Sequence, residues 1–334
     1  MTYSIVIVTY NSAEYIADLA SSIVQQTKQP EQIVVVDNAS SDNTGLLVQQ
    51  HLPTALFLPQ TQNQDLSYAA NLGIAQTRSD FVCLLNPDLR LMPTALDQLL
   101  QYCTHQKTIG AVSPKLLRLD DTGKTTTVID SMGIVADRSR RFRNLGEGVI
   151  DQGQYDHKPV FGLTGAAILF RKTALDDIAR HGGGKPHEYL DEQFKAYKDD
   201  IDIAYRLRHR GWELCVLPMA VAYHHRSARE STTNRLNRHR SKRSQRINRY
   251  SLRNHWWLLL KNEPWQNLCI DMPFILWYEM QKLVFLLFFE RSSLTMIVDY
   301  YRGFFAMAKK RRAIMDSSKT SKQYLRSWFR RSAT

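Results

Sequence analysis

Apolar residues in the first hundred positions alternate between short continuous runs and stretches with helical spacing. The continuous runs are rich in Val and Ile and predict strands buried on both faces at residues 4–10, 33–36, 55–58 and 81–85. The helical spacing predicts helices at residues 14–26, 44–51 and 67–75. This alternation predicts an α/β fold with a mostly parallel sheet flanked by helices.

Two acidic loops follow these strands, at Asp37 and at Asp88. In a parallel sheet, ligands bind beyond the carboxyl ends of the strands. A hard divalent cation prefers carboxylate oxygens, which suits Asp88, whereas Asn86 can help only as a neutral ligand. Each loop also has a structural explanation. Asn86-Pro87-Asp88 is a common surface turn, and Asp42 beside Asp37 is a candidate helix N-cap.

The middle of the chain is harder to interpret. Residues 111–162 show little periodicity, after which we expect a strand at 162–170, a helix at 199–211 and a strand at 214–217. The helix begins with the acidic residues Asp199, Asp200 and Asp202. Such residues complement the helix dipole, but closely placed carboxylates also raise one another's pKa, as a general base requires. His224 and His225 follow the last strand as candidate metal ligands, although a histidine there is more often structural.

Positive charge is concentrated in the last third of the chain. The net charge is +12, and residues 231–334 carry 21 basic and 6 acidic residues. Residues 270–289 are rich in Phe, Leu, Ile and Trp but contain Glu279, Gln281 and Lys282. A membrane-spanning helix needs about 20 nearly uncharged residues, so we expect an amphipathic, basic helical region that lies on an anionic membrane surface. A helical pair packed on the preceding α/β part of the chain is an equally good explanation.

Other features narrow the class of protein. The four cysteines are far apart and the N-terminus shows no signal sequence, so we expect a cytoplasmic setting. No G-x-G-x-x-G follows the first strand, which disfavours a dinucleotide-binding dehydrogenase. A sugar nucleotidyltransferase and a nucleic-acid-binding protein remain as alternatives. The apolar aromatic segments in the basic region suit lipid better than nucleic acid, and we expect no nucleic-acid partner.

Several segments together resemble the family 2 inverting glycosyltransferases of GT-A type, and most closely the rhamnosyltransferases. The matching segments are SIVIVTYN (4–11), IVVVDNASSDNT (33–44), FVCLLNPDLRL (81–91), LTGAAILFRK (163–172), YKDDIDIAYRLRHRGW (197–212) and AYHH (222–225). They recur in the family's order over residues 3–230. The resemblance implies a GT-A-like, Rossmann-related sheet in residues 1–230, with donor binding in about 1–110 and the acceptor and base region in about 111–230. Residues 231–334 would form the membrane-associating extension.

The resemblance also implies roles for individual residues. Asp200 would be the catalytic base, with Asp199 in the place of the family's Glu, and Asp88 and His224 would bind Mg²⁺ or Mn²⁺. His224 fits the family's histidine better, although the adjacent His225 leaves this choice open. The residues implied in binding the donor nucleotide are Thr9, Tyr10, Asn11, Asp37, Asn71 and Asn86. Asp65 and Tyr68 depart from the family pattern, which has small residues there, so the donor pocket is expected to differ in shape.

The implied reaction is inverting transfer of rhamnose or a related hexose. The donor would be a nucleoside-diphosphate sugar, dTDP-rhamnose or a UDP-sugar, and the acceptor a glycan, often lipid-linked, in cell-surface polysaccharide synthesis. We therefore expect a peripheral enzyme at the inner face of the cell membrane. The oligomeric state is not indicated by the sequence.

Overall fold

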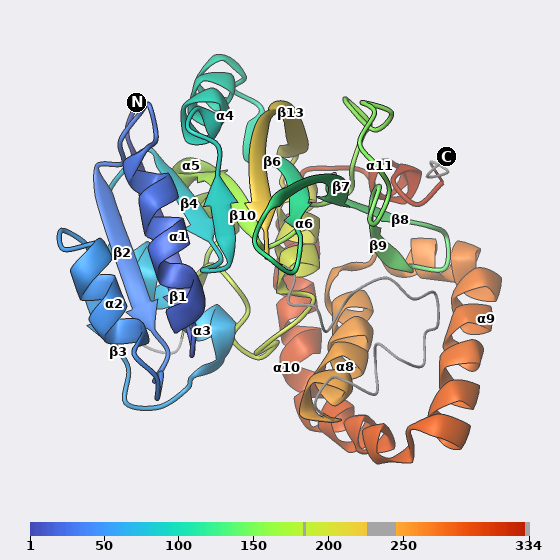
Figure 1. Ribbon diagram of the computed structural model, residues 1–334. Coiled ribbons are helices and arrows are strands. Elements are labelled where there is room, and N and C mark those ends of the chain that lie inside the picture. Colours follow the sequence, from blue (N-terminus) through green and yellow to red (C-terminus); the bar gives the residue numbers. More distant parts are fainter. Residues whose placement is uncertain (183–184, 226–244, 331–334) are drawn as a thin grey trace.

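A twisted sheet forms the centre of the molecule, and the computed structural model describes residues 1–182, 185–225 and 245–330 (Figure 1). Within these residues the strand order is β3-β2-β1-β4-β10-β6-β13-β5, with β7 paired to β6. The strands of this sheet are β1 (Tyr3–Thr9), β2 (Gln32–Asp37), β3 (Leu56–Pro59), β4 (Phe81–Leu85), β5 (Leu89–Leu91), β6 (Ile109–Leu119), β7 (Thr125–Ser131), β10 (Ala167–Arg171) and β13 (Glu213–His224). Two small hairpins are formed by β8 (Ile134–Ala136) with β9 (Phe142–Asn144) and by β11 (Arg180–Gly182) with β12 (Lys185–Glu188).

The N-terminal half of the sheet is parallel, as the sequence predicts. β1 pairs in parallel with both β2 and β4, and β2 pairs in parallel with β3. The helices of this half are α1 (Ala13–Val24), α2 (Thr44–His51) and α3 (Asp65–Ala75). Thr9 lies opposite Asp37 at the carboxyl ends of β1 and β2, so the two loops that follow meet at one edge of the sheet.

The other half of the sheet is mixed, which differs from the largely parallel sheet expected. β10 runs antiparallel to β4 and β6, and β5 runs antiparallel to β13. The strand β6 was not predicted from the sequence because Ser113, Pro114 and Lys115 interrupt its apolar run. Lys115 is nonetheless buried, because its ammonium group pairs with Asp151 at 2.7 Å and Asp156 at 2.9 Å.

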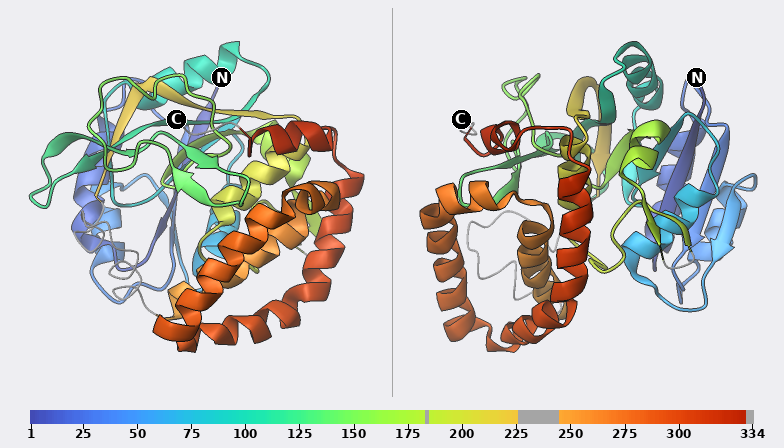
Figure 2. Two further views of the ribbon diagram at one scale, coloured as in Figure 1. Left: turned by 90° about the vertical axis from the view of Figure 1, so that its right-hand side faces the viewer. Right: turned by 180° about the vertical axis from the view of Figure 1, so that it is seen from behind.

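Helices cover both faces of the sheet (Figure 2), and alternate residues of each strand supply the two apolar layers. Ile5 and Ile7 of β1 pack on the side of α1, α2 and α4 (Ala95–His105). Val6 packs on the opposite side, in a layer that also takes in α3, α5 (Lys172–Ile178) and α6 (Asp199–His209). The predicted α/β architecture with both faces covered is confirmed.

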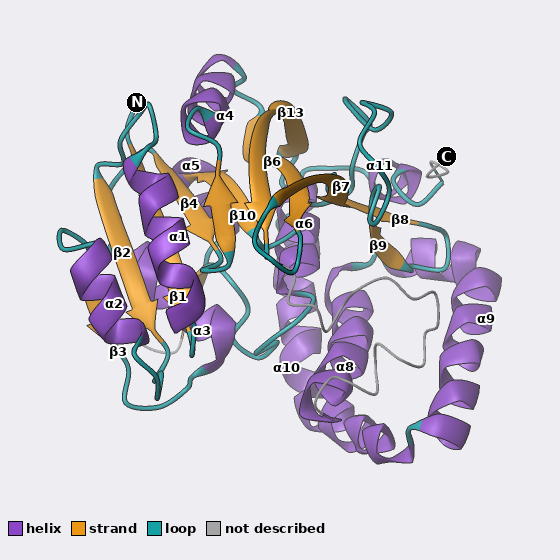
Figure 3. Ribbon diagram, viewed as in Figure 1, coloured by secondary structure: helices purple, strands orange, loops and turns teal. Residues whose placement is uncertain are grey.

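Helices make up the described C-terminal region (Figure 3). They are α8 (Gln245–Asn262), α9 (Trp265–Phe289), the short 3-10 helix η2 (Arg291–Thr295), α10 (Met296–Asp316) and α11 (Lys322–Ser327). α8 and α10 cross closely, since a Cβ at Gly303 of α10 would lie 2.2 Å from the Trp257 ring of α8. Both helices also contact α6, whereas α9 runs along the outer edge away from the sheet (Figure 1).

Candidate active site

The loops after β1 and β2 are joined by a small hydrogen-bond network around Asp37. Its carboxylate accepts hydrogen bonds from the hydroxyl of Thr9 at 2.8 Å and from the backbone N–H of Ser40 at 3.1 Å. Asn11, with φ of 48°, accepts a hydrogen bond from the N–H of Ser41 at 2.8 Å. Thr9 and Asp37 are buried, so these contacts fix the carboxylate at the end of β2.

Tyr10 and Asp42 occupy different positions in these loops. The Tyr10 side chain is 52% exposed at the end of β1, where its ring is available to a flat ligand. Asp42 accepts hydrogen bonds from the N–H groups of Thr44 and Ala13, the first residues of α2 and α1. Although burial acts to raise the pKa of Asp42, these hydrogen bonds outweigh it and lower that pKa. Asp42 therefore stabilises two helix N-termini, although the N-cap of α2 is Asn43 and not Asp42 as the sequence suggested.

Asn71 on α3 makes only structural contacts in the described residues. Its amide N–H groups donate to the carbonyl oxygen of Leu190 at 2.8 Å and to Glu192 at 3.2 Å. Its amide oxygen accepts hydrogen bonds from the N–H groups of Tyr189 and Leu190. The amide is thus used to hold the segment before α6. These contacts give no support to a direct role in nucleotide binding.

Asp88 and His224 are brought together by the pairing of β5 with β13. β5 begins directly after Asp88, and Leu89 pairs with His224. The His224 Nε2 atom lies 3.2 Å from an oxygen of the Asp88 carboxylate. His225 turns elsewhere, with its ring 5.4 Å from that of Tyr15 and its Nε2 3.9 Å from Asp18. Of the two histidines that the sequence offers, His224 is the one that faces Asp88.

Asp130, which orients His224, was not predicted from the sequence. Asp130 is fully buried on β7, and its carboxylate accepts a hydrogen bond from His224 Nδ1 at 2.9 Å. Burial of the ring lowers the pKa of His224, but Asp130 and Asp88 outweigh it and raise that pKa to about 10. Asp130 lies in the stretch without periodicity, 94 residues from His224, so only the fold reveals the pair.

The donor atoms around His224 suit a divalent cation. Within the described part of the chain, His224 Nε2 and Asp88 Oδ1 are buried and have no hydrogen-bond partner. With a pKa of about 10, His224 keeps a proton on Nε2 that faces Asp88 at neutral pH. Loss of that proton would leave the Nε2 lone pair available while Asp130 holds Nδ1–H, which is the usual arrangement of a metal-binding histidine. Among residues 1–182, 185–225 and 245–330, no group of three or more His, Cys, Asp or Glu side chains is arranged to hold a metal. The described residues thus bring two candidate ligands together, and a hard cation would need further oxygen ligands from elsewhere.

Asp199 and Asp200 lie at the N-terminus of α6, beside the end of β4. Both line a cavity of about 20 Å³, together with Asn86 and Gly165. The backbone N–H of Asn86 donates to the carbonyl oxygen of Ala166 at 2.8 Å, which ties the β4–β5 turn to this cavity. Asn86 precedes Asp88 by two residues, so the acidic pair and the Asp88 turn lie at the same edge of the sheet.

The pKa values of both carboxyl groups are raised. Burial and the neighbouring charge of Asp200 raise the pKa of Asp199 to about 7. Burial also raises the pKa of Asp200, although the ammonium group of Lys198 opposes the shift. A carboxylate with a raised pKa is a stronger base than an ordinary one, which suits proton removal from a hydroxyl. The third acidic residue, Asp202, is fully buried and pairs with Arg206 and Lys261 instead.

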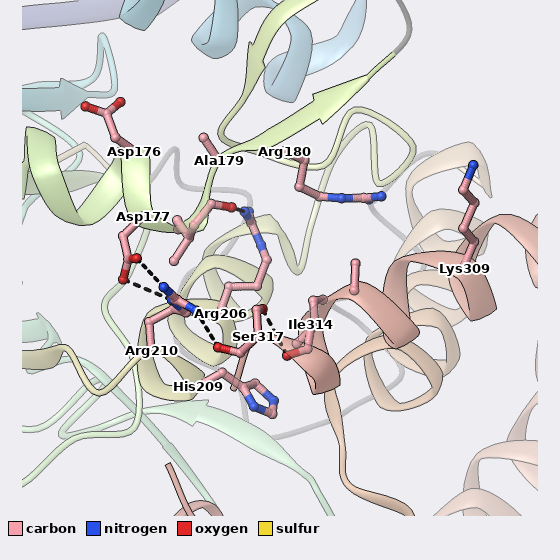
Figure 4. A pocket seen from close by; sticks show the side chains of 12 residues that line it. Asp176, Asp177, Ala179, Arg180, Arg206, His209, Arg210, Lys309, Ile314 and Ser317 are labelled. Carbon is pink, nitrogen blue, oxygen red and sulfur yellow. Dashed lines mark hydrogen bonds and ion pairs between the residues drawn. The ribbon is translucent and has the colours of Figure 1, made fainter. Parts of the chain in front are cut away.

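A larger cleft of about 580 Å³ lies at the other end of α6 (Figure 4). Two of its arginines are engaged, since Arg206 donates to the carbonyl oxygen of Ile178 and Arg210 pairs with Asp177. Arg180 also lines the cleft. Three helices, α5, α6 and α10, end at this cleft, and carbonyl groups at the ends of α5 and α10 accept hydrogen bonds from Arg206 and Arg210. This cleft contains none of the carboxylates described above as candidates for proton transfer or metal binding.

Comparison with known proteins identifies the family. The sequence profile of "Glycosyl transferase family 2" matches residues 4–179. The chain is 26% identical over 242 residues to the N-acetylglucosaminyl-diphospho-decaprenol L-rhamnosyltransferase of Mycobacterium tuberculosis, covering 67% of this chain and 76% of that protein. The expected resemblance to family 2 glycosyltransferases, including rhamnosyltransferases, is confirmed.

Two solved structures support the expected GT-A-like fold. TarS of S. aureus aligns over 98% of this chain and 90% of its own, with 15% identity and a TM-score of 0.56. The mannosyltransferase PcManGT from Pyrobaculum calidifontis, solved with GDP-Man and Mn²⁺, aligns over 98% of this chain and 84% of its own, with 17% identity and a TM-score of 0.53. The chain is a glycosyltransferase and belongs to glycosyl transferase family 2.

Proposed function

We propose that the protein transfers a sugar, with inversion, from a metal-bound nucleoside-diphosphate donor to a glycan acceptor. The observation that carries this proposal is the arrangement of His224. One ring nitrogen is held by Asp130, and the other faces Asp88 without a hydrogen bond in the described residues. This arrangement lies at the same sheet edge as the acidic pair Asp199–Asp200.

Asp88 and His224 would hold Mg²⁺ or Mn²⁺, with the diphosphate of the donor completing the set of ligands. A divalent cation supplies stabilisation of the negative charge that develops on the departing nucleoside diphosphate. Binding would replace the proton that the two carboxylates keep on His224. PcManGT, solved in complex with GDP-Man and Mn²⁺, supports a divalent ion of this kind.

The chemistry would be a single displacement at the anomeric carbon. Asp200 takes the proton from the acceptor hydroxyl as the new carbon–oxygen bond forms. The bond from the anomeric carbon to the diphosphate oxygen breaks, and its electron pair leaves with the nucleoside diphosphate. One displacement inverts the configuration of that carbon. Asp199 lies beside the base, and burial together with the charge of Asp200 raises the pKa of Asp199 to about 7, so a proton can be held within the acidic pair near neutral pH.

The nucleotide would lie over the ends of β1 and β2. Asp37 is fixed in place to accept a hydrogen bond from an N–H of the base, and the exposed ring of Tyr10 is available for stacking. Thr9 and Asn11 set the shape of these two loops. Asn86 would contribute from the β4–β5 turn. In this proposal Asn71 acts indirectly, by holding the segment that leads to α6.

The leading donor is dTDP-rhamnose, with a UDP-sugar as the alternative, and the leading acceptor is a lipid-linked glycan in cell-surface polysaccharide synthesis. The name of the mycobacterial relative, a rhamnosyltransferase acting on N-acetylglucosaminyl-diphospho-decaprenol, supports both choices. An acceptor of this kind is held in a membrane, so the enzyme must reach a lipid surface.

The C-terminal region, 231–334, would provide that contact at the cytoplasmic face of the membrane. α9 is long and apolar enough to cross a membrane by length and composition, but its acidic residues are bound to the rest of the protein. Asp271 pairs with Arg140, and Glu279 accepts a hydrogen bond from Trp256. The polar side of α9 therefore contacts the rest of the protein, and its apolar side is exposed to solvent. This arrangement favours a helix lying in the membrane interface over a spanning one.

The apolar surface of α9 is large. Its exposed members are Trp265, Ile270, Met272, Phe274, Leu276, Trp277, Met280, Leu283, Val284, Leu287, Phe288 and Phe289. An apolar patch of this size on a soluble protein marks a binding surface. The arginines of residues 226–244, which the sequence also assigns to membrane attraction, lie outside the described residues.

Thermal unfolding with a panel of nucleotide sugars tests the proposed donor. In the presence of Mg²⁺ or Mn²⁺, dTDP-rhamnose should raise the unfolding temperature more than GDP- or ADP-sugars do. A chelator should remove the shift. If no nucleoside-diphosphate sugar changes the unfolding temperature with either metal, the proposed function is wrong.

A further inference from the structure

The segment leading into the acidic pair has an unusual backbone. Lys195, Tyr197 and Lys198 have φ values of 66°, 67° and 71°, in the left-handed region that residues other than glycine rarely adopt. Lys198 is the residue directly before Asp199 and the N-cap of α6. Such a conformation persists only where the surrounding structure holds it, and it is found most often at functional sites.

Asn254 of α8 holds this segment. Its fully buried amide group donates to the carbonyl oxygens of Phe194 at 2.7 Å, Ala196 at 2.8 Å and Tyr197 at 2.9 Å. These carbonyl groups flank the left-handed residues. One side chain therefore fixes the direction of the backbone across the three residues before Lys198.

Arg253 orients that amide. Its guanidinium donates to the Asn254 side-chain oxygen at 3.0 Å from Nε and 2.8 Å from Nη2. With its oxygen occupied in this way, Asn254 must present its N–H groups to the carbonyl oxygens. Arg253 also donates to the carbonyl oxygens of Gln193 and Phe194.

Buried ion pairs also connect α8 to both ends of the segment that contains the left-handed residues. Lys261 lies 2.6 Å from Asp191, before the left-handed residues, and 2.8 Å from Asp202, after the acidic pair. Asn262 also donates to Asp202, at 2.8 Å. All of these side chains are buried, so water does not weaken the contacts. The four residues of α8 together fix the chain from 191 to 202.

We propose that Asn254 and Arg253 are positioning residues that hold the left-handed segment so that Asp199 and Asp200 face the reacting sugar. α8, from the basic C-terminal region, is then a part of the catalytic unit and not only of a membrane anchor. This inference rests on the proposed function, because it takes Asp200 as the base.

The test compares Asn254→Ala with Arg249→Gln. Arg249 lies on the same helix but pairs with Asp299 of α10, so its loss loosens α8 without touching the segment. With dTDP-rhamnose, Mn²⁺ and a synthetic N-acetylglucosaminyl-diphospho-lipid, Asn254→Ala should lower kcat by about 10-fold or more, while the donor KM stays within about twofold. Arg249→Gln should leave both constants close to wild type.

A second readout does not depend on transfer. Amide hydrogen exchange of residues 194–201 should be at least about 10-fold faster in Asn254→Ala than in wild type, and unchanged in Arg249→Gln. If Asn254→Ala does not fold, Arg253→Lys keeps the charge but loses the forked contact with the amide, and should show the same pattern to a smaller degree.

The outcomes are distinct. Unchanged exchange in Asn254→Ala would contradict the proposal, and so would faster exchange with wild-type kcat. An equal fall of kcat in Arg249→Gln would show a general effect of α8 stability and would also overturn it. Absence of transfer by the wild-type enzyme would count against the proposed function, whereas the exchange measurement would still report on the contact made by Asn254.

Discussion

At the scale of single residues, the candidate site combines groups that could react with neighbouring side chains that orient them. Asp88, Asp200 and His224 stand out in the sequence because they fall in family motifs, at strand ends or at the start of a helix. Their partners do not stand out. Asp130 and Asn254 belong to no motif, since their roles come from contacts with residues 94 and at least 57 positions away. Sequence reasoning therefore finds the groups that would react and misses those that orient them.

Asp130→Asn should weaken metal binding. The substitution removes the negative charge that holds His224 by its Nδ1–H, so the ring loses its orientation and part of its basicity. We expect the Mn²⁺ concentration for half-maximal transfer to rise by about 10- to 100-fold. Saturating metal should restore much of the rate. Asp121→Asn, on an exposed turn of the same hairpin, serves as the control. Equal metal dependence in the two variants would contradict the role of Asp130.

Asp199→Asn should stabilise the protein at alkaline pH. The folded-state pKa of Asp199 is raised from 3.8 to about 7, so its ionisation costs stability as pH rises between about 4 and 7, and the full cost remains above that range. The neutral amide avoids this cost. The variant should unfold about 2 °C or more above wild type at pH 8. The difference should shrink towards pH 5, and thermal unfolding across this range measures it. If the difference in unfolding temperature between Asp199→Asn and wild type grew on acidification, this would contradict a raised pKa of Asp199 in the folded protein.

At the scale of elements, the strands of the N-terminal half could be predicted from the sequence because each of them is a continuous apolar run. The predicted bounds of α2 and β4 agree with the structure to the residue. The strands β6 to β9 were not predicted. β6 carries a buried lysine whose two carboxylate partners lie more than thirty residues away, and β8 and β9 are only three residues long. Short strands and buried ion pairs leave no local periodicity to detect.

The outward face of α9 should bind lipid. Phe288 is 71% exposed, and Phe288→Glu removes apolar surface and adds a negative charge near an anionic membrane. The two effects together should weaken binding to vesicles with anionic lipid by about 2 kcal/mol, or roughly 30-fold. Leu46→Glu makes the same kind of change on α2, which belongs to the catalytic half. Co-sedimentation measures both variants. Equal binding by both would exclude α9 as the membrane contact.

At the scale of the whole molecule, the described C-terminal helices differ in their surroundings. α8 is joined to α6 by the buried ion pair Lys261–Asp202, and α10 is joined to the segment before α6 by the buried ion pair Lys310–Asp191. α9 turns its apolar side outward. The sequence left open whether this region packs on the domain or on lipid. The packing of α8 and α10 on the domain is observed, and the lipid contact of α9 remains a prediction.

The assignment of Asp200 as the base of a metal-dependent sugar transfer is central to the proposed mechanism. The most direct test measures transfer by Asp200→Asn together with its affinity for the donor in the presence of Mn²⁺. Loss of the base should slow transfer by about 10²- to 10⁴-fold. The donor Kd from calorimetry should stay within about twofold of wild type, because the proposed donor contacts are made by other residues. Near-normal turnover by Asp200→Asn would contradict the assignment.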